Sequence, residues 1–179
     1  MRIREGCARE FAGRVRGVKV ASLVPSATEI LFALGLGDEV VAVTHECDWP
    51  GEATRLPRLT RSVLPPGLEP AEIDSRVREL TGRGEAIYEL DRERLAALEP
   101  DLIVTQAVCA VCAVSYDEVC SLAAGLPGEP AVLSLDPSTL DDVFGDVRQV
   151  AAACGRKQLG ERLAKELARR VETVRSRTE

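Results

Sequence analysis

The 179-residue sequence is long enough for one domain or one and a half, and its balance of 45% apolar to 29% charged residues is typical of a globular protein. Its formal net charge is −6 and its arginines are scattered among acids, which argues against nucleic-acid binding. Membrane insertion is not expected either, because no stretch reaches the roughly 18 apolar residues of a spanning helix.

Residues 1–17 are charged and show no periodic pattern, so we predict a flexible N-terminal arm. The arm lacks the apolar stretch of a signal peptide. As written, the chain is therefore expected in the cytoplasm. A periplasmic or other extracytoplasmic location is the alternative if the start is misassigned or a leader has been removed.

Apolar runs and helical patterns alternate from residue 18 onward. Strands are predicted at 18–24, 39–44, 101–105 and 131–135, with a short one at 86–88. A helix is predicted at 71–83, and another, capped by Asp91, holds Leu95 and Leu98 and ends at Pro100. Three further helices should start at capping boxes, which begin at Ser26, Ser115 and Ser138. The proline-containing stretch 45–70 is predicted to be mostly loop.

This alternation predicts an α/β fold with a parallel sheet and helices on both faces, followed by a long C-terminal helix. That helix extends to about Arg177, with Gly155 as a candidate break. Ligands of such sheets bind beyond the carboxyl ends of the strands. Function is therefore expected in the loops that begin at Pro25, His45 and Gln106.

Four segments resemble, in order, the substrate-binding proteins of vitamin B12 and iron-siderophore ABC importers. They are 20–35 (VASLVPSATEILFALG), 41–50 (VAVTHECDWP), 95–104 (LAALEPDLIV) and 133–143 (LSLDPSTLDDV). The resemblance implies two lobes joined by a long helix. It makes 18–137 a ligand-binding lobe and 138–179 the inter-lobe helix, with the second lobe absent from this sequence. Self-association through the face that the missing lobe would cover is a further expectation.

The ligand implied by this resemblance is a corrinoid (vitamin B12-like) or a related metal chelate, and the implied partner is an ABC permease. The resemblance and the strand-exit loops together select candidate ligand-binding residues: Pro25, Ser26, Thr28, His45, Glu46, Trp49, Gln106, Cys109 and Tyr116. His45 is a candidate ligand of the cobalt, and Trp49 offers a flat apolar face. Hydrogen bonding, packing and helix capping remain alternative roles for these side chains.

Two strand-exit loops also carry thiols near the single imidazole. His45, Cys47, Cys109 and Cys112 together form a candidate site for zinc or an iron–sulfur cluster. The simpler alternative is that these thiols are merely reduced. A thiol oxidoreductase using Cys109 and Cys112 is a third hypothesis.

Glu93 lies where relatives present an acid to the permease, although a solvated helix face is the favoured explanation for such a charged residue. The sequence contains one histidine and neither a G-x-S-x-G nor an H-E-x-x-H motif. We therefore expect a binding protein rather than an enzyme.

Overall fold

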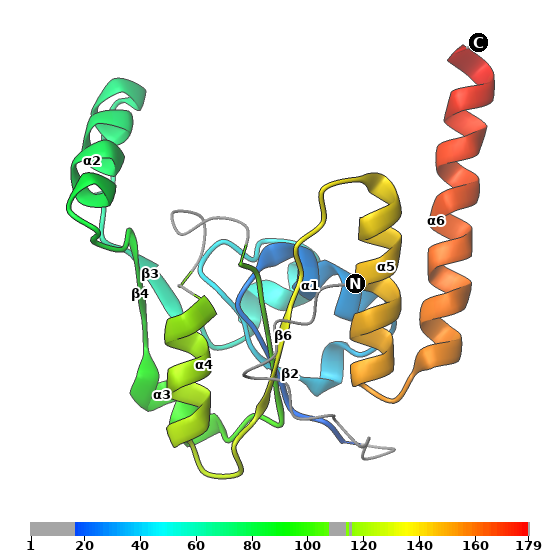
Figure 1. The fold of residues 1–179 in the computed structure, drawn as a ribbon, viewed down its shortest axis with the longest axis horizontal. Helices are drawn as coiled ribbons and strands as arrows, with labels where there is room; N and C mark the ends of the chain where they lie inside the picture. The colour runs from blue at the N-terminus through cyan, green and yellow to red at the C-terminus, as the bar shows by residue number, and fades with distance from the viewer. Residues whose placement is uncertain (1–16, 108–113, 115, 179) are drawn as a thin grey trace.

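The computed structural model describes residues 17–107, 114 and 116–178 (Figure 1). The predictions for the N-terminal arm, Cys109, Cys112 and the capping box at Ser115 fall partly or wholly outside these residues. None of the described helices is long and apolar enough to cross a bilayer.

Four parallel strands form the central sheet, in the order β2-β1-β5-β6. They are β1 (Val20–Ser22), β2 (Val40–Ala42), β5 (Leu102–Thr105) and β6 (Ala131–Ser134). The predicted strands at 18–24, 39–44, 101–105 and 131–135 each contain one of these four. The parallel sheet is thereby confirmed.

Helices cover both faces of this sheet, as predicted. Helices α1 (Pro25–Ala33) and α5 (Leu140–Ala153) pack on one face, against Val20 and Val104 among others. On the other face, α3 (Arg92–Leu98) and α4 (Tyr116–Gly125) pack against Ala21 and Ile103. Adjacent strand residues thus enter opposite cores, which is the consequence of the two-residue period of a strand.

A two-stranded antiparallel sheet lies beside the main one. It pairs β3 (Thr60–Ser62) with β4 (Tyr88–Leu90), and α2 (Pro70–Gly82) lies between them in the chain. The bridge between Val43 and Arg58 joins this part to the end of β2. Two short 3₁₀ helices, Gly37–Glu39 and Gly51–Arg55, complete the described elements.

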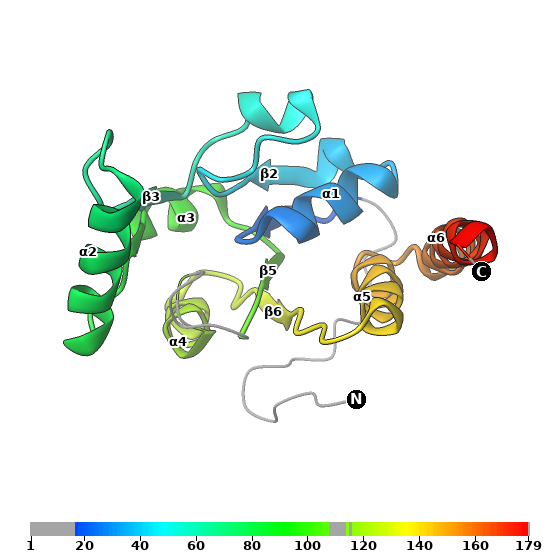
Figure 2. The same ribbon diagram turned by 90° about the horizontal axis from the view of Figure 1, so that it is seen from above.

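Two helices project beyond the carboxyl ends of the strands (Figure 1), and they lie on opposite sides of the molecule (Figure 2). One is α2, and the other is the C-terminal part of α6 (Lys157–Thr178). Helices α5 and α6 lie side by side along the first turns of α6, where Gly160 and Ala164 are buried. The long C-terminal helix is therefore confirmed as α6, and the chain breaks before it at Gly155, whose φ is +69°.

Two local predictions are corrected. Helix α1 has Val24 as its N-cap and Pro25 at its first turn, so Ser26 does not cap it. Helix α5 is capped by Thr139, whose capping box with Asp142 lies one residue after the predicted one at Ser138. The stretch 45–70 is mostly loop, as predicted, and contains β3 and a short 3₁₀ helix.

Candidate functional site

A pocket of about 200 Å³ lies where β1 and β2 end. Its walls come from the turn before α1, the loop after β2, both strands of the β3–β4 sheet, and the segment before α4. The lining residues are Leu23, Pro25, Thr44, His45, Glu46, Thr60, Tyr88 and Val114. Three of the predicted ligand-binding residues, Pro25, His45 and Glu46, therefore come together at the expected edge of the sheet.

The His45 side chain is the most constrained polar group in this pocket. Its Nδ1 atom lies 2.7 Å from Thr60 Oγ1, and its ring stacks edge-on against Tyr88 with 5.1 Å between centroids. Its Nε2 atom is buried and has no hydrogen bond within the described residues, although Glu46 Oε1 lies 3.2 Å away. A buried polar atom without a full partner is costly and indicates a place where a ligand atom can bind.

Cys47 belongs to a hydrogen-bonded layer beneath the pocket. Its Sγ atom lies 3.1 Å from both Thr28 Oγ1 and Thr44 Oγ1, and Thr28 donates to Ser22 Oγ at 2.8 Å. The guanidinium group of Arg58 donates to the carbonyl oxygens of Thr44 and Cys47. The turn that carries His45 is thus held by side chains from α1 on one side and by Arg58 on the other.

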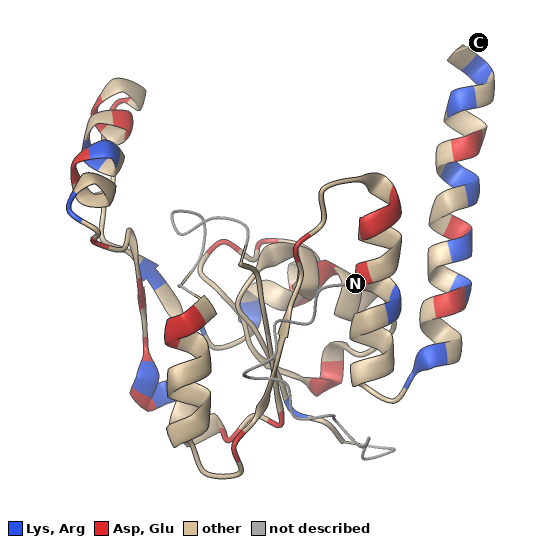
Figure 3. Ribbon diagram, in the orientation of Figure 1, with Lys and Arg blue, Asp and Glu red and all other residues tan. Residues whose placement is uncertain are grey.

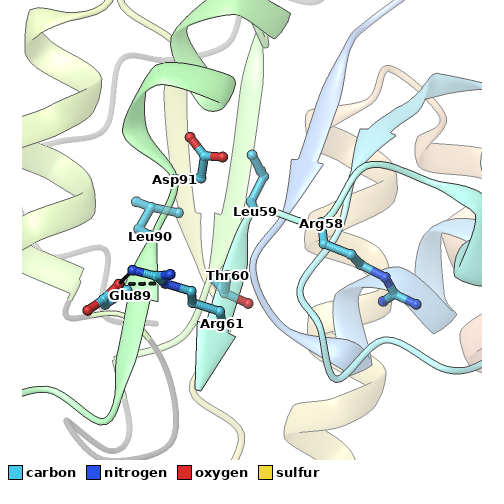
Figure 4. Close-up of a pocket in the computed structure, with 7 residues that line it drawn as sticks. All are labelled: Arg58, Leu59, Thr60, Arg61, Glu89, Leu90 and Asp91. Atoms are coloured by element: carbon cyan, nitrogen blue, oxygen red, sulfur yellow. Dashed lines mark hydrogen bonds and ion pairs between the residues drawn. The ribbon is translucent and has the colours of Figure 1, made fainter. Parts of the chain in front are cut away.

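A second hollow, of about 360 Å³, lies against the β3–β4 sheet (Figure 4). Arg61 and Glu89 form an ion pair across the two strands at its rim. The Arg58 side chain extends away from this hollow, toward the turn described above. Thr60 on β3 borders both this hollow and the His45 pocket.

Trp49 lies in a different place from His45. Its side chain is 67% exposed and lines a groove of about 550 Å³ between α1 and α6. Leu163, Leu167 and Arg170 of α6 form the opposite side of this groove. Its predicted ligand contact stays a prediction, but it does not line the His45 pocket.

The start of α5 is acidic, whereas α6 carries both basic and acidic residues along its length (Figure 3). A further acid of α5, Asp146 in the middle of the helix, is only 5% exposed. Burial, and secondarily the carboxylates of Asp136 and Asp142, raises the pKa of Asp146 to about 6. Asp142 differs, because hydrogen bonds from Thr139 and Ser138 lower its pKa.

The proposed metal ligands are only partly described. The His45 ring contacts Thr60 and Tyr88, while the Cys47 thiol is buried against Thr28 and Thr44. Within the described part of the chain, no three histidine, cysteine or acidic side chains gather as a metal site. Because Cys109 and Cys112 lie outside it, the zinc or cluster site and the thiol oxidoreductase stay hypotheses.

The remaining candidates lie at varying distances from this pocket. Ser26 is exposed, Thr28 is buried in the layer beneath the pocket, and Gln106 is half-buried just after β5. Tyr116 opens α4 and packs against the core on that face of the sheet. Glu93 is exposed in the first turn of α3.

Sequence reasoning missed Thr60 and Tyr88 as pocket residues. Both come from the antiparallel sheet, whose first strand shows one buried residue followed by two exposed ones. A three-residue strand is too short for an alternating pattern to stand out. The signal available in the sequence was the pair of polar and aromatic residues in short β-prone stretches, which does not indicate which strand pairs with which.

Comparison with known proteins gives a family match. The model of a family described as periplasmic binding protein matches residues 20–179. The vitamin B12-binding protein of Pectobacterium carotovorum subsp. carotovorum (strain PC1) is 26% identical over 166 residues, covering 88% of this chain and 45% of that protein. That of Yersinia pestis (strain Pestoides F) is 26% identical over 165 residues, covering 89% and 45%. The chain thus spans about half the length of these relatives.

Solved structures of binding proteins share the fold of this chain, which again covers about half of each of them. The periplasmic vitamin B12-binding protein of Vibrio cholerae has a TM-score of 0.64 at 22% identity, covering 89% of this chain and 50% of that one. The periplasmic heme-binding protein of Roseiflexus sp. RS-1, in its apo form, has a TM-score of 0.63 at 26% identity, covering 90% and 50%. The structure therefore corresponds to one lobe of such proteins.

Proposed function

Because this chain belongs to the periplasmic binding protein family, we propose that it binds a corrinoid or a related metal chelate in the pocket around His45. The observation that carries the proposal is the buried Nε2 atom of His45, which lies at the carboxyl edge of the sheet without a hydrogen bond from any described residue. That edge is where ligands bind in parallel α/β sheets. The similar proteins include vitamin B12-binding and heme-binding ones.

The dimensions of the pocket limit what one lobe can hold. Its volume of about 200 Å³ is below the roughly 300–1,000 Å³ of complete small-molecule sites. A macrocycle of corrin size would therefore place only one edge or substituent here. Leu23, Pro25 and Val114 would contact the apolar part of that edge, and His45 and Glu46 its polar atoms.

Titration of the purified chain with hydroxocobalamin, and separately with hemin, tests this proposal by visible absorption. We expect a saturable spectral change with at least one of them and a tenfold or greater loss of affinity in His45→Ala. Trp49→Ala separately tests the predicted contact of Trp49, because Trp49 lines the other groove and a loss of affinity in this variant would mean that the ligand also reaches that groove. Absence of binding by a folded chain, or unchanged binding by His45→Ala, would refute the assignment.

Delivery of this ligand to an ABC permease is part of the same proposal, and it implies an extracytoplasmic location. Glu93, exposed on α3, is the proposed docking acid. A permease reconstituted with the chain should lose stimulation of its ATPase activity with Glu93→Lys but not with Glu72→Lys, a change on the separate helix α2. Equal effects of both changes would argue against a role for Glu93.

A further inference from the structure

One hydroxyl group makes two contacts with His45. Thr60 Oγ1 lies 3.1 Å from the backbone nitrogen of His45 and 2.7 Å from its Nδ1 atom. Thr60 is only 9% exposed, and no other hydrogen bond of its hydroxyl is present among the described residues. Thr60 on β3 thus contacts both the backbone and the Nδ1 side of the imidazole ring of His45.

The number of available protons decides the direction of these bonds. A backbone N–H can only donate, so Thr60 Oγ1 accepts from His45 N. The hydroxyl has one hydrogen, and the Nδ1 atom is the acceptor within its reach. If Nδ1 carried a proton instead, the buried Thr60 hydrogen would have no acceptor there, which is unfavourable. The neutral ring then carries its proton on Nε2.

The other side of the ring favours the same proton position. Nε2 lies 3.2 Å from Glu46 Oε1. A carboxylate oxygen attracts an N–H group and repels a bare nitrogen lone pair at this distance. Both neighbours of the imidazole ring, one on each nitrogen, thus select the same form.

We infer that Thr60 is a positioning residue that holds neutral His45 in the Nε2–H form, so that the pocket presents a hydrogen-bond donor to its ligand. The significance for ligand binding rests on the proposed function, but the proton position does not. A chelate with peripheral amide oxygens can accept from this donor, beside Glu46 Oε1 or in its place. Coordination of a metal by Nε2 would instead need the proton moved to Nδ1 and the Thr60 hydroxyl turned to accept it.

Nitrogen-15 NMR of the ligand-free chain tests the inference directly, since His45 is its single histidine. Spectra are recorded at about pH 9, where an ordinary imidazole is uncharged. The original chain should show Nε2 protonated and Nδ1 bare, in one dominant form. Thr60→Val should raise the share of the Nδ1–H form and give a mixture whose remaining bias is set by Glu46, and Thr60→Ser should restore the original pattern.

Two further variants make the test specific. Thr54→Val removes a hydroxyl that, among the described residues, donates to the carbonyl oxygen of Gly51, and it should leave the His45 signals unchanged. If Glu46→Gln produces the mixture and Thr60→Val does not, Glu46 rather than Thr60 selects the form, and the inference is overturned. A proton on Nδ1 in the original chain would overturn it as well.

Adding hydroxocobalamin to the labelled chain separates this inference from the proposed function. Retention of the Nε2 proton in a saturated complex supports contact through a donor. Loss of that proton on binding indicates metal coordination and overturns the donor role. Absence of binding refutes the proposed function, while the proton position measured in the free chain stands.

Discussion

Replacing Asp146 by Asn should stabilise the chain at neutral pH and much less in mild acid. Asp146 is 5% exposed in α5, and its pKa is raised from the ordinary 3.8 to about 6. A carboxyl group that titrates at a higher pH in the folded chain than in the unfolded chain binds protons more tightly when folded. Its contribution to stability is complete below pH 3.8 and is lost as the pH rises through 6.

The difference between these two pKa values sets the magnitude. Well above pH 6, ionised Asp146 costs about 3 kcal/mol relative to a neutral side chain. At pH 4.5, where Asp146 remains mostly protonated in the folded chain, the same relation gives about 1 kcal/mol. The advantage of Asn over Asp should therefore grow by about 2 kcal/mol between pH 4.5 and 7.5.

Urea unfolding followed by circular dichroism at pH 4.5, 5.5, 6.5 and 7.5 measures this growth for both chains. Asp141→Asn is the matched control, because Asp141 lies on the same helix with an exposed side chain. The pH slope, rather than the absolute difference, is the quantity to compare, since Asn can add a constant packing effect. An Asp146→Asn advantage that is equal at pH 4.5 and 7.5 would refute the reasoning.

Two further predictions concern α5 and its packing. Gly160→Ala should lower the free energy of unfolding by about 1–3 kcal/mol, because an added Cβ would lie 2.5 Å from Ala151 Cβ. Gly145→Ala, at an open helical position, should instead raise the free energy of unfolding by about 0.5–1 kcal/mol. Thermal unfolding of both variants checks the opposite signs, and equal effects would contradict the close packing of α5 and α6. In urea unfolding, Thr139→Ala should lower the free energy of unfolding by about 1 kcal/mol, because it removes the cap of α5. Ser138→Ala should lower it by less than about 0.5 kcal/mol. The reverse order would place the cap at Ser138.

The strands of the main sheet could be predicted because they are buried on both faces and read as continuous apolar runs. Val20 and Val104 illustrate this, since each is fully buried in a segment of apolar neighbours. The cap of α5 was harder to place. Ser138 and Thr139 are each followed three residues later by an aspartate, so the capping pattern fits twice and only the backbone decides between them.

The wall of the candidate site that contains His45 could be predicted from the sequence, but the wall formed by the β3–β4 sheet could not. His45 follows a recognisable strand and was placed correctly at the carboxyl edge of the sheet. Its partners Thr60 and Tyr88 lie on two short strands separated by α2, and their pairing depends on tertiary structure. The Ser26 cap was wrong for a local reason, because Pro25 fits the first turn of a helix and the N-cap is Val24, two residues earlier.

Helix α6 is packed against the rest of the lobe only near its beginning, so a small rotation there moves its far end by a larger distance. Gly160 and Ala164 fix its base against α5, and Val171 is the last residue that is even partly covered. From Ala164 to Thr178 the helix extends for about 21 Å at 1.5 Å per residue. A tilt of about 10° at the base would move the tip by about 4 Å. A small change in the packing of Gly160 against Ala151 is thereby amplified into a larger displacement of the C-terminal end of α6 at Thr178.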